Sequence, residues 1–94
     1  MTEEIKKYME DKFGSVEVIE MSDEQQNPVV QYKSEFRGLV ITFLLNWKFK
    51  SLKLQLSSKS DGFEFNEFDD FMIYKNSINI VTETYEDIIR IIKS

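Results

Sequence analysis

The sequence contains no cysteine and no histidine. Without cysteine, disulfide bonds and thiolate metal sites are excluded. Without histidine, the commonest general base and the commonest metal ligand of proteins are both missing. We therefore expect a protein that is not an enzyme and that carries no metal or other cofactor.

Glycine and proline are also scarce, with three glycines and one proline in 94 residues. Gly14, Gly38 and Gly62 are isolated from one another, so there is no glycine-rich loop that could hold a phosphate group. Each glycine stands where a hydrophobic pattern breaks, which indicates a helix end or a turn. A nucleotide-binding enzyme is not indicated.

No hydrophobic run approaches the ~20 residues of a membrane-spanning helix. The longest run, Leu39–Leu45, is interrupted by Thr42. The first residues lack the apolar stretch of a signal peptide. We expect a cytoplasmic protein with no membrane contact, and a chain of this length predicts a single domain over residues 1–94 with its own core.

Charge is divided unevenly along the chain, whose net charge is −5. Residues 1–24 carry eight acidic and three basic residues, and residues 61–94 carry the same numbers. Residues 25–60 carry one acidic and six basic residues. We expect the acidic ends to fold over the basic middle and neutralise it.

Two helices are predicted from apolar residues at helical spacing. The first covers residues 3–13, ends at Gly14, and has an apolar stripe of Ile5, Tyr8, Met9 and Phe13. The second begins at a cap provided by Thr82 or Thr84, with acidic Glu83, Glu86 and Asp87 in its first turn. Its apolar stripe consists of Tyr85, Ile88, Ile89, Ile91 and Ile92.

Several strands are predicted between these helices. Alternating or β-branched apolar residues indicate strands over residues 15–21, 29–36 and 39–49, and another strand contains Phe63 and Phe65. Residues 66–74 are ambiguous, because Asn66 could cap a helical turn. We favour an acidic connection followed by a hairpin, with strands Phe71–Tyr74 and Ser77–Val81 joined at Lys75 and Asn76.

The apolar residues change parity near residue 50, from odd numbers up to Phe49 to even numbers from Leu52. A hairpin turning at Lys50 and Ser51 explains this change. It places Trp47 and Phe49 in the core, opposite Leu54 and Leu52. The same register places Lys48 opposite Lys53, where like charges destabilise the pair.

The order of these elements predicts an α+β fold. It consists of an N-terminal helix, an antiparallel meander sheet of about five to six strands and a C-terminal helix, with both helices on one face. The other face of the sheet is expected to be partly open. This order, together with the acidity, is similar in pattern to small secretion-chaperone-like domains and to small inhibitor or immunity proteins of bacteria and phages.

A protein partner is expected at two surfaces. Val40 and Leu44 lie on the face opposite the main core, flanked by Lys48 and Lys53, and suit a sheet-on-sheet homodimer or a docked partner. The strand over residues 29–36 could instead accept a partner strand at an edge. The second surface is an acidic patch of Glu67, Asp69 and Asp70.

Two alternatives stay open. Lys48, Lys50, Lys53 and Lys59, near aromatic side chains, could form a nucleic-acid-binding module, although the hairpin separates these aromatics from the lysines and the protein is acidic. The acids of residues 61–70 could form a metal-dependent enzyme site, although they do not match an EF-hand loop. The favoured hypothesis is a small acidic inhibitor or adaptor, of the kind that phages or mobile elements encode.

Overall fold

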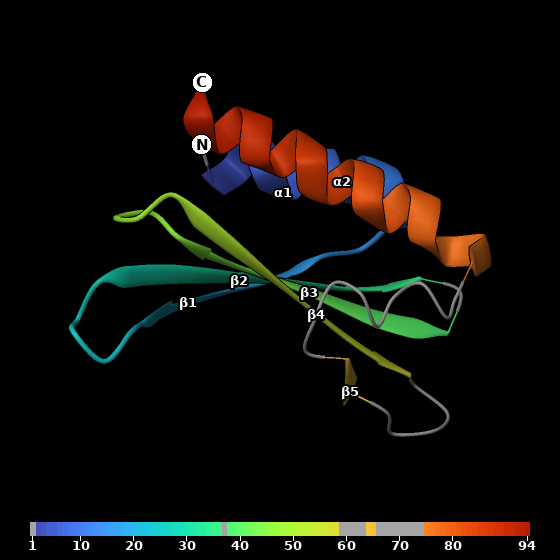
Figure 1. Ribbon diagram of the computed structural model, residues 1–94, viewed down its shortest axis with the longest axis horizontal. Coiled ribbons are helices and arrows are strands. Elements are labelled where there is room, and N and C mark those ends of the chain that lie inside the picture. The colour runs from blue at the N-terminus through green and yellow to red at the C-terminus, as the bar shows by residue number, and fades with distance from the viewer. Residues whose placement is uncertain (1, 37, 59–63, 66–74) are drawn as a thin grey trace.

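The computed structural model describes residues 2–36, 38–58, 64–65 and 75–94. Within them, two helices flank a run of antiparallel strands (Figure 1). The elements in chain order are α1 (Thr2–Phe13), β1 (Glu17–Ser22), β2 (Pro28–Phe36), β3 (Leu39–Asn46), β4 (Ser51–Ser58), β5 (Glu64–Phe65) and α2 (Lys75–Lys93).

The strands form one antiparallel sheet in the order β1-β2-β3-β4-β5. Four of them are full strands, whereas β5 adds only two residues, which pair with Leu56 and Ser57 of β4. The α+β class and the meander are therefore confirmed. Among the described residues, the expected five to six strands are corrected to four, with this short addition. The sheet curves beneath both helices, which cover the same face (Figure 1).

The hydrophobic core lies between the helices and this face of the sheet. Alternate residues of β2, β3 and β4 meet the buried side chains of α1 and α2 in one cluster. Its fully buried members include Tyr32, Ile41, Phe43, Leu45, Leu56, Ile88 and Ile92. None of the described helices is both long enough and apolar enough to span a membrane.

The N-terminal helix forms as the sequence predicts. Ile5, Met9 and Phe13 are buried on one stripe, and the helix ends at Gly14, whose φ of 94° suits glycine. The two helices also contact each other through polar groups. The Tyr8 hydroxyl donates a hydrogen bond to the Asp87 carboxylate, which pairs with Arg90.

The β3–β4 hairpin exists, but the predicted position of its turn is wrong. The turn covers residues 47–50, not Lys50 and Ser51, and Leu45 pairs with Leu52. Phe49 is therefore 59% exposed instead of facing the core. Lys53 lies opposite Leu44, so the predicted Lys48–Lys53 pair does not form.

Local hydrogen bonding explains the earlier turn. The Asn46 side-chain oxygen accepts hydrogen bonds from the backbone N–H groups of Lys48 (3.1 Å) and Phe49 (3.4 Å). An asparagine that binds the backbone two residues later favours a turn over a continued strand. Lys50 then closes the turn with a φ of 49°. Leu52 thus pairs with a residue four positions earlier in β3 than predicted. Because four is an even number, the residues of β3 and β4 that face the core stay as predicted.

The C-terminal helix begins earlier than predicted. It starts at Lys75, so the predicted turn at Lys75 and Asn76 and the strand Ser77–Val81 are both wrong. Its buried residues include Val81, Thr84, Ile88 and Ile92. The helical stripe thus extends back to Val81, and packing overrides the strand preference of the β-branched segment. The predicted strand Phe71–Tyr74 lies outside the described residues.

The threonines proposed as helix caps lie inside α2 instead. Thr84 is completely buried, and its hydroxyl donates a 2.6 Å hydrogen bond to the carbonyl of Ile80. This bond satisfies the hydroxyl within the helix. The three acids expected in the first turn consequently lie in the middle of α2.

Candidate functional site

The second face of the sheet carries no helix among the described elements (Figure 1). Strand pairing places Met21 beside Val29, and the row Ile19–Gln31–Leu44–Lys53 crosses four strands. Neighbouring apolar side chains on this face form what we call the apolar strip, consisting of Ile19, Met21, Val29 and Leu44. Ile19 is 39% exposed and Met21 is 45% exposed, so two neighbouring large apolar side chains of the strip are open to water.

The structure brings together three of the sheet-face residues predicted from sequence. Leu44 and Lys53 are direct neighbours on the second face, and Val40 lies further along β3 on the same side. Lys48 does not join them, because it lies in the β3–β4 turn. The strand β2, predicted as an accepting edge, is instead paired on both sides by β1 and β3, so that prediction is wrong.

Sequence reasoning assigned no role to Ile19 and Met21, although a signal was present. Val18 is partly buried against the core, whereas Ile19 and Met21 have the opposite parity. In a strand, opposite parity means opposite faces. The strand β1 therefore directs two large apolar side chains away from the core.

The lysine-rich turn forms a separate surface. Phe49 is exposed there, and the Lys48 ammonium lies 5.6 Å from the centre of its ring. Trp47, by contrast, is only partly exposed and packs against the core. Lysines and one aromatic ring are thus neighbours on this turn, but the indole is directed elsewhere.

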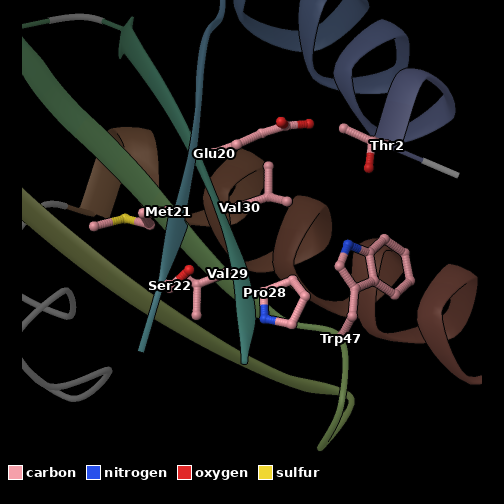
Figure 2. A pocket seen from close by; sticks show the side chains of 8 residues that line it. All are labelled: Thr2, Glu20, Met21, Ser22, Pro28, Val29, Val30 and Trp47. Atoms are coloured by element: carbon pink, nitrogen blue, oxygen red, sulfur yellow. The ribbon is translucent and has the colours of Figure 1, made fainter. Parts of the chain in front are cut away.

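A cleft of about 440 Å³ lies where the turn end of the β1–β2 ladder meets the start of α1. Figure 2 shows the Trp47 indole and the Pro28 ring on one side, with the Glu20 carboxylate directed toward Thr2. The cleft combines apolar walls with one carboxylate. A second hollow of about 470 Å³ lies at the other end of the same ladder, lined by Ser15, Val16, Glu17, Lys33, Ser34 and Glu35.

The corner near Glu20 is electrostatically negative. The hydroxyl of Tyr32 is completely buried and has no hydrogen-bond partner within the described part of the chain, and this burial raises the pKa of Tyr32. The nearby Thr2 hydroxyl opposes this rise in the pKa of Tyr32, although no hydrogen bond of normal geometry joins the Thr2 and Tyr32 hydroxyls. The negative charges of Glu3 and Glu20 raise the pKa further, so both carboxylates act on the same buried hydroxyl.

Asp23 joins the two turns at this end of the sheet. Its carboxylate accepts hydrogen bonds from the Asn27 backbone (2.8 Å) and side chain (2.9 Å), the Gln25 backbone (2.8 Å) and the Asn46 side chain (3.1 Å). The bonds from Asn27 contribute most to holding the pKa of Asp23 below the usual value of an aspartate. The network positions Asn46, which in turn shapes the lysine-rich turn.

Asp23→Asn is expected to lower the melting temperature at pH 7, because the amide supplies one acceptor oxygen where the carboxylate supplies two. The folded-state pKa is depressed, so the carboxylate stabilises the fold above its unfolded pKa. This contribution is lost as the pH falls through the folded-state value. Melting curves from pH 7 down to pH 2.5 should show the difference between the two proteins shrinking. Glu24→Gln, at an exposed position of the same turn, is the control and should melt at pH 7 within a few degrees of the wild type.

The acidic patch proposed at Glu67, Asp69 and Asp70 lies outside the described residues, as does Lys59. Among residues 2–36, 38–58, 64–65 and 75–94, no group of three or more acidic residues is arranged to hold a metal ion. The metal-dependent alternative placed in residues 61–70 therefore stays a prediction.

Neither protein-family models, nor curated proteins, nor solved structures show a match to this chain.

Proposed function

We propose that this protein is a non-enzymatic, cytoplasmic binding protein, an inhibitor or adaptor, that contacts another protein through the second face of its sheet. The observation that carries this proposal is the apolar strip, with Ile19 and Met21 more than one third exposed. Monomeric proteins seldom leave neighbouring large apolar side chains open to water, and such surfaces typically mark sites of association.

The composition around the apolar strip supports a protein partner. Lys33 and Lys53 lie on the same face as the strip, as do Glu17 and Glu35. An apolar centre with charged residues of both signs around it is the usual arrangement of a protein–protein interface. Val40, Leu44 and Lys53 are therefore kept as contact residues, and Ile19, Met21 and Val29 are added to them.

Variants of the strip test this proposal. The immobilised full-length protein should capture a partner from an extract of the cells that naturally contain it. Met21→Glu and Leu44→Glu should each reduce the captured amount at least tenfold, because each places a charge in an apolar contact. Leu44→Glu should still fold, since Lys53 lies opposite.

Phe49→Glu is the matched control, because it removes an exposed apolar side chain outside the strip. It should leave capture unchanged. Capture that is equal for all three variants and the wild type would contradict the proposal. Circular dichroism of each variant checks that the fold is retained.

Nucleic-acid binding is the second candidate function, favoured by the exposed Phe49 ring beside Lys48. Bases could stack on the ring while Lys48, Lys50 and Lys53 contact phosphates. Fluorescence anisotropy with a single-stranded oligonucleotide tests this function. Binding that weakens with salt and with Phe49→Ala would support it, and an unchanged signal in low salt would exclude it.

A further inference from the structure

The strand β1 ends the sheet on one side. The strand order places β1 next to β2 only, and no described strand pairs with its outer side. With respect to the described residues, the backbone groups on that side can therefore pair with an additional strand. Natural edge strands are commonly protected by charged side chains, especially lysine, by proline or by a bulge. The β1 sequence, Glu-Val-Ile-Glu-Met-Ser, has no lysine or proline and carries two glutamates, which oppose pairing with an acidic strand but not with a basic one.

The charges on this edge are negative. Glu17 and Glu20 are both exposed. Glu17 lies opposite Lys33 and is partly balanced by it, whereas Glu20 lies opposite the apolar Val30. Glu3 and Glu20 both raise the pKa of the buried Tyr32 hydroxyl, so two carboxylates lie near this part of β1.

We propose, building on the proposed function, that the outer edge of β1 accepts an extended basic segment of the partner protein as an additional antiparallel strand. Charge complementarity selects this occupant. A lysine or arginine opposite Glu20 gains an ion pair on the helix side of the sheet. Apolar residues opposite Ile19 and Met21 continue the apolar strip onto the partner.

A second copy of β1 does not satisfy the same requirements. A two-fold antiparallel pairing centred on Glu20 places the two Glu20 side chains directly opposite each other, and like charges there are destabilising. A pairing centred on Ile19 avoids this clash, but it still brings Glu17 and Glu20 of both copies, four glutamates in all, to the contact between the two strands. The strand β4 pairs with β5 only at Leu56 and Ser57, so residues 51–55 of its outer edge have no partner among the described strands. The one lysine of that stretch, Lys53, lies on the second face of the sheet, whereas Glu20 lies on the helix side, so β4 of a second copy places no cation opposite Glu20.

The partner segment follows from the alternation of side chains along β1. An antiparallel partner runs from the residue opposite Ser22 to the residue opposite Glu17. Along that direction it should carry an apolar residue opposite Met21, a basic residue opposite Glu20 and an apolar residue opposite Ile19. A second basic residue opposite Glu17 completes the pattern. The peptide Thr-Ile-Lys-Val-Thr-Lys has this pattern, and Thr-Ile-Glu-Val-Thr-Glu is its acidic counterpart.

Binding of these two labelled peptides to the full-length protein is measured by fluorescence anisotropy. The lysine peptide should bind at least tenfold more tightly than the glutamate peptide, and added salt should reduce this preference. Glu20→Lys should weaken binding of the lysine peptide about tenfold and favour the glutamate peptide. Glu24→Lys, which reverses an exposed charge in the adjacent turn, should change neither affinity by more than about twofold.

Amide hydrogen exchange identifies the edge that is used. The lysine peptide should slow the exchange of β1 amides and leave the amides of β4 unchanged. Equal binding of both peptides, or no effect of Glu20→Lys, would overturn the proposal. Concentration-dependent dimerisation in sedimentation that is abolished by Glu20→Lys would also overturn it, in favour of a second copy.

The two proposals fail separately. If neither peptide binds while capture of the cellular partner still depends on Met21 and Leu44, the edge inference is wrong and the sheet-face function stands. If capture does not depend on the apolar strip, the sheet-face function is wrong whatever the peptides do.

Discussion

Phe43→Ala is expected to lower the free energy of unfolding by about 3–5 kcal/mol, the usual cost of removing a buried phenylalanine. Phe43 is completely buried in β3, where it lies between Tyr32 and Leu54. Its ring centre is 6.5 Å from that of Tyr85 on α2. The truncation therefore leaves a cavity at the junction of sheet and helix, and it removes a large part of the ~5–15 kcal/mol that is typical of folded domains.

Phe49→Ala is the matched control for this prediction. The same substitution in the β3–β4 turn should change the free energy of unfolding by less than about 0.5 kcal/mol, because Phe49 is largely exposed. Urea denaturation of both variants measures the difference. A similar loss in the two variants would place Phe49 in the core and restore a turn at Lys50 and Ser51.

Thr82→Pro is expected to destabilise the protein by about 3 kcal/mol or more. Residue 82 lies seven positions inside α2, so proline there removes an intrahelical hydrogen bond and clashes with the preceding turn. For a domain of this size, the loss corresponds to a fall in melting temperature of roughly 12–24 °C. Thermal unfolding followed by circular dichroism at 222 nm measures it.

Thr82→Ala separates the effect of proline from the loss of the threonine side chain. Alanine favours a helix interior, so this variant should melt within a few degrees of the wild type. If the helix began at residue 82, proline would stand near its first turn, where it is well tolerated. A small effect of Thr82→Pro would therefore support the shorter helix that the sequence alone predicted.

The candidate site was predictable in part. Val40 and Leu44 were assigned to the second face because the parity of β3 is readable in the sequence, and Lys53 was placed on the same face because the register error was an even number of residues. Lys48 was misplaced because the turn begins at Asn46, whose side chain binds the following backbone. The parity of β1 is also readable and places Ile19 and Met21 on the second face, but no local pattern shows that this strand lies at a sheet edge, where both side chains stay exposed.

By itself, the sequence determined the class of fold, the stripe of α1 and the inward faces of β2, β3 and β4. These properties follow from periods of two and 3.6 residues, which adjacent residues establish without distant contacts. Only the tertiary structure decided the position of the β3–β4 turn and the first residue of α2. The turn begins at Asn46, whose side chain binds the following backbone and is itself held by the Asp23 carboxylate from another part of the chain. Residues 75–81 become helical because Val81 packs into the core.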